Sequence, residues 1–234
     1  MRNSRDILIT ADINESLQKE MAAAKLQADV IPFIQTKTII TKKVQEQIEH
    51  ISTLNTTVIF TSGNAVEAVQ EHLQNKKPAW KIFSVGNSTS SLVKKIFNEE
   101  TVISVADNAR ALSEKIIKHK GSINEVYFFC GDKRRDELPE LLTKNNIPVH
   151  EVEVYTTTIL QYETEKYYDG ILFFSPSAVK GFFENNVVEE KTVLFAIGNT
   201  TAEEIKNFSK NKIIVSDTPG KQDLINKVIG YFNA

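Results

Sequence analysis

The stretch Val58-Ile-Phe-Thr-Ser-Gly-Asn-Ala-Val66 returns later in the chain as Ile171-Leu-Phe-Phe-Ser-Pro-Ser-Ala-Val179. A second stretch, Ile82-Phe-Ser-Val-Gly-Asn-Ser-Thr89, returns as Leu194-Phe-Ala-Ile-Gly-Asn-Thr-Thr201. The offset is 113 residues for the first pair (179 minus 66) and 112 for the second (194 minus 82). Because the register is kept over so long a distance, the chain is interpreted as a duplication. A ligand site formed between two similar halves becomes the leading hypothesis.

The composition is that of an ordinary globular protein, because 41% apolar and 25% charged residues argue against long disorder. A length of 234 residues suits two domains. No segment has the length and apolarity of a membrane span, and the N-terminus lacks the apolar core of a signal peptide. We therefore expect a cytoplasmic protein without a membrane partner. The formal charge of −2, with both signs interspersed, gives no support to a nucleic-acid partner.

Signatures of metal, nucleotide and nucleophilic chemistry are missing from the sequence. The single cysteine, Cys130, excludes an internal disulfide, and the four histidines are too scattered for a zinc site. Neither G-x-G-x-x-G after a strand, nor a P-loop, nor a nucleophile elbow occurs. Cys130 ends an apolar run, which favours a buried, inert thiol over a reactive one. The sequence therefore predicts no metal, and it gives no support to dinucleotide or P-loop nucleotide binding.

Short apolar runs alternate with amphipathic segments of helical length, such as Ala65–Leu73 and Leu138–Lys144. This alternation is typical of an α/β fold with buried parallel strands. The expected strands are Ile7–Thr10, Val58–Thr61, Ile82–Val85, Val102–Val105, Val126–Cys130, Val149–Tyr155, Ile171–Phe174, Leu194–Ile197 and Ile213–Val215.

The repeat also predicts how the halves are threaded. The C-terminal half runs out of chain after Ile213–Val215, and its missing members lie at the N-terminus. There, Asp6–Thr10 matches Val126–Cys130 and Asp29–Ile34 matches Val149–Val154. We predict two doubly wound parallel-sheet domains of similar topology, one discontinuous (1–33 plus 160–234) and one continuous (40–150). The two β-rich crossings, 34–39 and 151–159, would form a two-stranded β linker that permits hinge motion.

Residues suited to helix caps follow most of the expected strands. In open α/β sheets, ligands gather outside the carboxyl ends of the strands. Capping explains most of these residues, and Pro176 and Pro219 suit a first helical turn. Free amide groups at several helix starts would also bind carboxylates or phosphates. The segments are Thr61-Ser62-Gly63-Asn64, Gly86-Asn87-Ser88-Thr89, Gly131-Asp132-Lys133, Ser175-Pro176-Ser177, Gly198-Asn199-Thr200-Thr201 and Ser216-Asp217-Thr218-Pro219.

Two further side chains have both a structural and a functional interpretation. Arg135 follows Gly131 and belongs either to a solvated turn or to an anion contact. Tyr155 lies on the second crossing, either as a packing aromatic or as a phenol that donates a proton or a hydrogen bond to a leaving hydroxyl or carboxylate.

The chain resembles the uroporphyrinogen-III synthase family over nearly its whole length. The order and spacing of the matching segments carry the resemblance more than any one motif does. The matches are Ile59-Phe-Thr-Ser62, Ala65-Val66, Val85-Gly86 with Thr89, Gly131 with Arg135 and Leu138, Val154-Tyr155 with Thr157, Phe174-Ser-Pro-Ser-Ala-Val179, and Ala196-Ile-Gly198 with Thr200-Thr201-Ala202.

The resemblance implies a cofactor-free cyclising lyase of haem biosynthesis. Its substrate, hydroxymethylbilane, is a linear tetrapyrrole with eight carboxylates. Loss of the hydroxyl gives an azafulvene cation, which attacks the substituted position of ring D, passes through a spiro intermediate and closes with ring D inverted. Such an enzyme acts chiefly by positioning and electrostatics. A monomer that receives substrate from the preceding pathway enzyme is expected.

The resemblance also suggests site residues. Tyr155 matches the tyrosine proposed in the family to assist departure of the hydroxide. The helix starts and strand ends that match the family's ligand contacts carry over as substrate-binding residues: Thr61, Ser62, Gly63, Asn64, Gly86, Thr89, Gly131, Arg135, Ser175, Pro176, Ser177, Gly198, Thr200 and Thr201.

Two positions depart from the family's pattern. Thr10-Ala11-Asp12 stands where Thr-Arg-Pro is common, and Cys130 stands where arginine is frequent. Both changes remove positive charge, which leaves open a tetrapyrrole- or polyanion-binding regulatory protein of the same fold without synthase activity. A glycosyl- or nucleotide-transferring enzyme is a weaker alternative, because no catalytic carboxylate pair or phosphate loop is visible.

Overall fold

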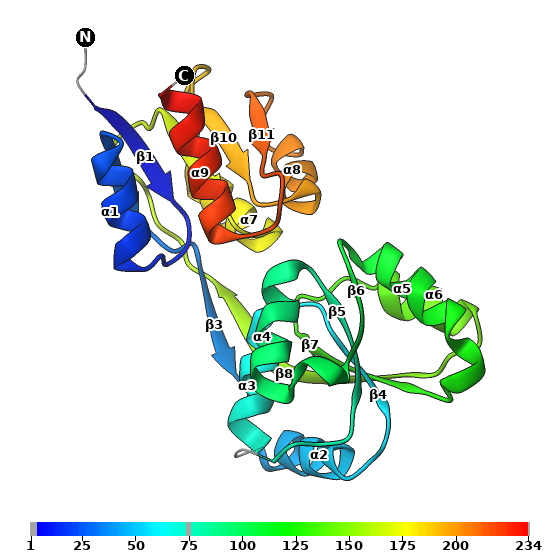
Figure 1. The fold of residues 1–234 in the computed structure, drawn as a ribbon. Helices are drawn as coiled ribbons and strands as arrows, with labels where there is room; N and C mark the ends of the chain where they lie inside the picture. The colour runs from blue at the N-terminus through cyan, green and yellow to red at the C-terminus, as the bar shows by residue number, and fades with distance from the viewer. Residues whose placement is uncertain (1–3, 74–75, 234) are drawn as a thin grey trace. The chain divides into compact units, whose positions relative to one another are not determined.

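The computed structural model describes residues 4–73 and 76–233, in which strands and helices alternate (Figure 1). The strands are β1 (Arg5–Ile9), β2 (Leu26–Val30), β3 (Ile34–Thr38), β4 (Thr57–Phe60), β5 (Lys81–Val85), β6 (Val102–Ala106), β7 (Val126–Gly131), β8 (Val149–Ile159), β9 (Gly170–Phe173), β10 (Val193–Ala196) and β11 (Ile213–Val215). The helices are α1 (Glu15–Ala23), α2 (Lys42–Ser52), α3 (Gly63–Leu73), α4 (Asn87–Phe97), α5 (Ala109–Lys118), α6 (Glu137–Lys144), α7 (Pro176–Asn185), α8 (Asn199–Lys206) and α9 (Lys221–Phe232). Short 3-10 turns follow α4 and α5 at Glu99–Thr101 and Lys120–Ser122.

The chain divides into two compact units, each with its own sheet. Unit 1 comprises Met1–Gln35 and Thr158–Ala234, and unit 2 comprises Thr36–Thr157. The strand order is β2-β1-β9-β10-β11 in the five-stranded sheet and β3-β8-β7-β4-β5-β6 in the six-stranded sheet. The expected α/β class with mostly parallel sheets is confirmed. Apart from β3, the two orders correspond strand for strand, with β1 in the place of β7 and β2 in the place of β8.

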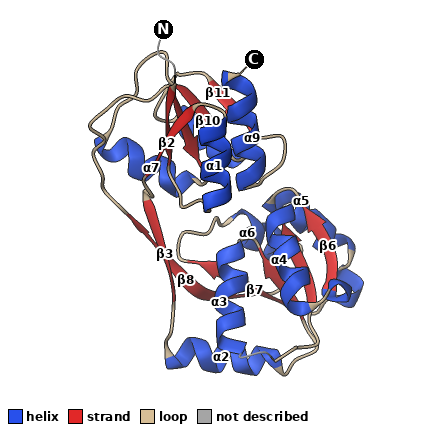
Figure 2. Ribbon diagram, turned by 60° about the vertical axis from the view of Figure 1, so that its left-hand side comes forward, coloured by secondary structure: helices blue, strands red, loops and turns tan. Residues whose placement is uncertain are grey.

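Both faces of the unit 2 sheet are covered by helices, as a parallel sheet requires (Figure 2). Successive residues of β4 point to opposite faces. Val58 and Phe60 pack in a core with α2, α3 and α4. Ile59 lies in a second core with α5 and α6. The continuous apolar run in the sequence is thus explained by burial on both sides.

Unit 1 has the same layers, and its strands and helices come from both the N-terminal and the C-terminal parts of the chain. Ile7 and Ile9 of β1 face α1 and α9, which lie side by side in Figure 1. Leu8 faces the core formed with α7 and α8. In this sheet the N-terminal strand β1 therefore lies between β2 and β9. β9 follows β1 in the sequence by more than a hundred residues.

An ionic network fastens the N-terminal strands of unit 1 to the chain that precedes β9. The Lys166 ammonium lies 3.0 Å from an Asp6 carboxylate oxygen and 2.9 Å from an Asp29 oxygen. The Tyr168 hydroxyl donates to Asp29 at 3.0 Å. The hydrogen bond to Asp29 is the largest cause that raises the pKa of Lys166 above its ordinary value. These contacts join residues that lie far apart in the sequence.

One expected strand was placed wrongly. The sequence predicted a single strand over Asp29–Ile34, whereas β2 ends at Val30 and β3 begins at Ile34. Pro32 accounts for the break, because proline has no N–H to continue a ladder. β3 then pairs with β8, as shown by the hydrogen bonds from Ile39 N to Val154 O (2.9 Å) and from Leu160 N to Phe33 O (2.9 Å). These two bonds show that β3 and β8 are antiparallel.

Two glycines in helices of unit 1 predict opposite effects of the same substitution. A Cβ at Gly181 in α7 would lie 2.7 Å from the Phe33 carbonyl oxygen and 3.0 Å from Ile159 Cγ2, whereas Gly230 in α9 has open space. We expect Gly181→Ala to destabilise the protein by about 1–3 kcal/mol through overpacking. Gly230→Ala should stabilise it by about 0.5–1 kcal/mol through helix propensity.

Thermal unfolding followed by circular dichroism measures both changes. A shift of the two variants in the same direction would contradict the packing of α7 against the chain at Phe33.

Candidate active site

The site in unit 2 begins at the carboxyl ends of β4 and β5. Ser62 precedes α3, and its hydroxyl accepts the Asn64 amide at 3.2 Å, while Gly63 begins the helix and Thr61 links it to β4. Gly86 caps α4 with φ +77°, a conformation that favours glycine, and a glycine at the N-cap supplies no capping side chain. The first amide groups of α4 therefore donate no hydrogen bond to an N-cap side chain.

A register shift between β7 and β8 determines the face of the sheet on which the Tyr155 side chain lies. Cys130 is opposite Glu153, but Gly131 is opposite Tyr155, so the register shifts by one residue between the two pairs. Because strand side chains alternate between faces, such a shift changes the face on which the next side chain lies. Tyr155 accordingly packs with the core of α2, α3 and α4, as Val152 and Val154 do. The shift places the phenol on the face of the sheet that carries α3.

The Tyr155 ring lies directly against Gly131. A Cβ added to Gly131 would lie 2.4 Å from Tyr155 Cζ and 2.8 Å from its hydroxyl oxygen, closer than any side chain could approach. The Tyr155 hydroxyl is hydrogen-bonded with the Ser62 side chain. Gly131 is thus required at this position because it leaves room for the ring.

The pKa of Tyr155 is raised above its ordinary value, chiefly by burial of the phenol. The hydrogen bond with Ser62 lowers it, and the nearby Cys130 and Asp132 raise it further. The phenol therefore keeps its proton at neutral pH and can donate it.

Asp132, which follows β7, was not singled out from the sequence. Its amide donates to the Tyr155 carbonyl at 3.2 Å, and its carboxylate oxygen Oδ1 accepts the Thr157 amide at 2.8 Å. Its other oxygen lies 3.8 Å from the Lys133 ammonium. The position directly after Gly131 was visible in the sequence, but its partners were not.

The arginines after Gly131 differ in their surroundings. Arg134 forms ion pairs with Asp136 and Glu151. Arg135 is exposed in the loop between β7 and α6. The segment after Gly131 was expected to open a helix at once, but α6 begins only at Glu137. Arg135 therefore lies in a loop and not at a helix start.

Cys130 is buried beside β8 and is not a candidate nucleophile. Its thiol points to the Val152 carbonyl oxygen at 3.8 Å. Burial raises its pKa to about 12, while the positive charge of Arg134 acts in the opposite direction. A thiol with this pKa is almost entirely protonated at neutral pH.

The matching edge of unit 1 contains the second group of predicted residues. Ser175 caps α7 by accepting the Ala178 amide at 3.1 Å, and Pro176 is in the first turn, with Ser177 half-buried beside it. Gly198 begins α8, again without a capping side chain. Pro219 differs from expectation, because Gly220 is the cap of α9 and Pro219 precedes it.

Each sheet thus brings together its own share of the predicted residues. Unit 2 contains Thr61, Ser62, Gly63, Asn64, Gly86, Thr89, Gly131, Arg135 and Tyr155. Unit 1 contains Ser175, Pro176, Ser177, Gly198, Thr200 and Thr201. Thr200 is half-buried, whereas the Thr89 and Thr201 residues are only 6% and 3% exposed. The two buried threonines offer a ligand little side-chain surface.

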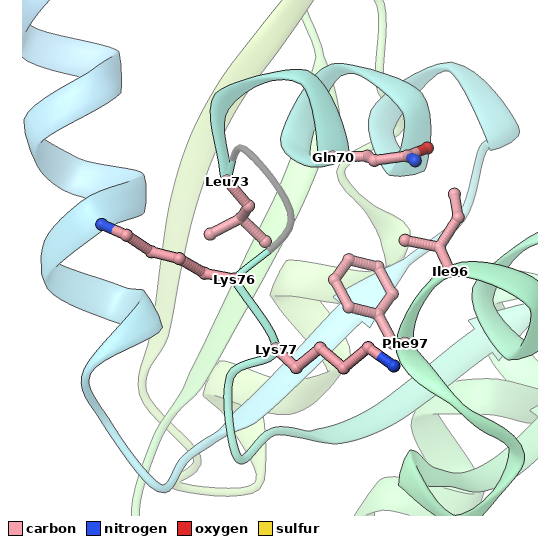
Figure 3. Close-up of a pocket in the computed structure, with 6 residues that line it drawn as sticks. All are labelled: Gln70, Leu73, Lys76, Lys77, Ile96 and Phe97. Atoms are coloured by element: carbon pink, nitrogen blue, oxygen red, sulfur yellow. The ribbon is translucent and has the colours of Figure 1, made fainter.

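Three hollows in the units lie apart from these residues. Figure 3 shows one of about 80 Å³ between α3 and α4, where Leu73, Ile96 and Phe97 converge beside Lys77. A second, of about 240 Å³, is lined by Asp217, Thr218, Asp223, Asn226 and Lys227. The third, of about 410 Å³, lies between α2 and the starts of β7 and β8. None of the three is lined by a residue of these two groups, although Asp217 and Thr218, which line the second, belong to the predicted cap segment Ser216-Asp217-Thr218-Pro219.

The described parts of the chain contain neither a metal-binding cluster nor a membrane-spanning helix. No group of three or more histidine, cysteine, aspartate or glutamate side chains within residues 4–73 and 76–233 could hold a metal ion. In the same residues, no helix has the length and apolarity needed to cross a membrane.

Comparison with known proteins gives one consistent match. The family model of uroporphyrinogen-III synthase HemD matches residues 15–226. A mutant uroporphyrinogen III synthase from the extremely thermophilic bacterium Thermus thermophilus is similar in structure, with a TM-score of 0.70 at 12% identity over 98% of both chains. Uroporphyrinogen-III synthetase from Helicobacter pylori has a TM-score of 0.65 at 14% identity, over 97% of this chain and 99% of that one. At such identities the structural likeness concerns the fold.

The surroundings of Cys130 predict its reactivity. With a pKa of about 12, only about one thiol in ten thousand is ionised at pH 8, whereas an ordinary thiol with a pKa of about 8.5 is ionised to roughly a quarter. We expect iodoacetamide to modify the native protein at least about a hundredfold more slowly than the urea-unfolded protein. Mass spectrometry of timed samples measures both rates. Equal rates would mean that β7 and β8 do not bury the thiol.

Proposed function

The chain belongs to the uroporphyrinogen-III synthase family, a family of cyclising lyases of haem biosynthesis, and we propose that Tyr155 assists the loss of the substrate hydroxyl. The substrate that the family implies is hydroxymethylbilane. The observation that carries the proposal is the half-buried, protonated Tyr155 phenol, which is held against Gly131 and hydrogen-bonded with Ser62.

The proposed step needs one proton from the protein. As the bond between the methylene carbon and the hydroxyl oxygen breaks, Tyr155 donates a proton or a hydrogen bond to the oxygen, which leaves as water. The electron pair of the adjacent pyrrole stabilises the cation that remains. Ring D attacks this cation, and the proton released when the rings regain their aromaticity balances the one donated. The phenol is protonated at neutral pH, and because burial raises its pKa it is better suited to donate a hydrogen bond to the leaving oxygen than to act as a strong acid.

Binding of the eight carboxylates is proposed to rest on the helix starts at the carboxyl edges of both sheets. α4 and α8 begin after Gly86 and Gly198, and neither has a capping side chain among the described residues. Their first amide groups and the positive ends of their dipoles would favour carboxylates. The remaining predicted binding residues stay part of this proposal, with Ser62 and Ser175 already used in caps.

The two units are proposed to act as similar, doubly wound domains. The boundaries remain those expected from the sequence, with 1–33 plus 160–234 as one domain and 40–150 as the other. The paired strands β3 and β8 would be the two-stranded linker. Two antiparallel tethers allow a hinge but resist twisting. Scattering profiles recorded with and without product test this, since identical profiles would count against closure.

The enzyme is further proposed to be a cytoplasmic monomer that receives its substrate from the preceding pathway enzyme. The single free cysteine, Cys130, is buried and needs no oxidising compartment. Light scattering coupled to size exclusion gives the oligomeric state. A stable dimer at assay concentration would contradict this part of the proposal.

Tyr155→Phe tests the role of the phenol. We expect the protein to convert hydroxymethylbilane to isomer III, measured in a coupled assay that resolves isomer III from the non-enzymatic isomer I. The variant should lose about a hundredfold in turnover, because general acid catalysis typically contributes that much or more. Its unfolding temperature should change little, since the ring is kept.

Tyr127→Phe is the matched control. It also removes only a hydroxyl from a strand of unit 2, and that hydroxyl donates to Glu125 at 3.2 Å, away from Ser62. Unchanged turnover in Tyr155→Phe would assign Tyr155 to packing. Tight tetrapyrrole binding by the unmodified protein without isomer III would instead indicate a binding protein of this fold.

A further inference from the structure

Asp132 holds β8 at Tyr155 and at Thr157. Its amide donates to the Tyr155 carbonyl, and its carboxylate accepts the amide of Thr157, two residues further along β8. Tyr155 itself is the residue opposite Gly131 after the register shift. A single residue in the loop after β7 therefore contacts the backbone at and beyond the phenol.

We propose that Asp132 is a positioning residue for the reaction, which fixes the backbone of Tyr155 so that the phenol points to Ser62. The proposal rests on the proposed function of Tyr155. Asp132 is expected to act through the acceptor oxygen that binds the Thr157 amide. It does not act as a second acid or base.

The register shift explains why a side chain, and not a strand carbonyl group, accepts the Thr157 amide. β7 ends at Gly131, so β7 offers no carbonyl group to the amides of β8 beyond Tyr155. A bulge disrupts the regular ladder and leaves groups unpaired. The carboxylate of Asp132 replaces the missing strand partner at 2.8 Å from Thr157 N, and a charged acceptor makes a stronger bond than a neutral one.

The surroundings of the carboxylate favour positioning over direct catalysis. One oxygen is occupied by the Thr157 amide, and the other faces the Lys133 ammonium at 3.8 Å. The hydroxyl of Tyr155 is hydrogen-bonded with Ser62 instead. The charge of Asp132 additionally helps to keep the phenol protonated.

Two substitutions separate the acceptor oxygen from the charge. Asp132→Ala removes the acceptor, and we expect kcat for isomer III to fall by about tenfold with KM within about twofold of its original value. Asp132→Asn keeps an acceptor oxygen in the same place, and its kcat should stay within about threefold of the original. Asp136→Ala, a substitution of an exposed carboxylate in the same loop, is the control and should leave kcat unchanged. An Asn variant as impaired as the Ala variant would overturn the proposal.

The double variant Asp132→Ala/Tyr155→Phe shows whether Asp132 acts through Tyr155. If it does, the double variant should turn over no more slowly than Tyr155→Phe alone, because residues that act as a unit are not additive. An equal loss from Asp132→Ala in both backgrounds would overturn the proposal.

A measurement without substrate distinguishes failure of this proposal from failure of the proposed function. In Asp132→Ala, the Thr157 amide should exchange with solvent at least about tenfold faster and the ring signals of Tyr155 should shift in NMR spectra. Asp132→Asn should show neither change. These changes would support the positioning role even if Tyr155→Phe proved fully active, a result that would reject only the role of the phenol. Unchanged Thr157 exchange in Asp132→Ala would reject the positioning role itself.

Discussion

The one-residue register shift between β7 and β8 is the constraint on which the site depends. Strand side chains alternate between the two faces of a sheet, so without the shift Tyr155 would point toward the core of α5 and α6. With the shift, it lies on the face of α3, where Ser62 meets its hydroxyl. The ring can occupy this place only because Gly131 has no Cβ. Glycine, bulge and phenol therefore form one arrangement and not three separate features.

Among the described residues, unit 2 has this arrangement and the similar unit 1 does not. In unit 1 the strand that corresponds to β7 is β1, and it ends before Thr10, whose hydroxyl donates to the Leu172 carbonyl at 2.7 Å within the sheet. The strand that corresponds to β8 is β2, which stops at Val30, two residues before Pro32. Unit 1 thus keeps the glycine-capped helix start at Gly198, but its described residues include no counterpart on β2 of the Tyr155 phenol. Such asymmetry between similar halves suits a reaction that treats one pyrrole ring unlike the other three.

The features of the fold that follow from the internal repeat could be predicted from the sequence. The repeat from Val58 to Thr201 predicted the correspondence between the two sheets, because parallel strands buried on both faces read as apolar runs. It could not show the register shift at Cys130 and Gly131, since a bulge changes hydrogen bonding and leaves the apolar pattern almost intact. The contacts of Asp132 with β8 were not predictable for the same reason, and the sequence placed Asp132 only in a cap segment, because its partners are backbone groups of β8. The end of β2 at Val30 differs from the prediction because Pro32, which has no N–H, stands inside an otherwise apolar run.

The most direct test of this account is the turnover of Gly131→Ala in the isomer-resolving assay, beside Gly121→Ala, where an added Cβ meets open space. The account predicts that Gly131→Ala displaces the Tyr155 ring and loses at least about tenfold in formation of isomer III, while remaining folded. Gly121→Ala should keep full activity. Full activity of Gly131→Ala would contradict the claim that the place of Tyr155 against Gly131 determines catalysis.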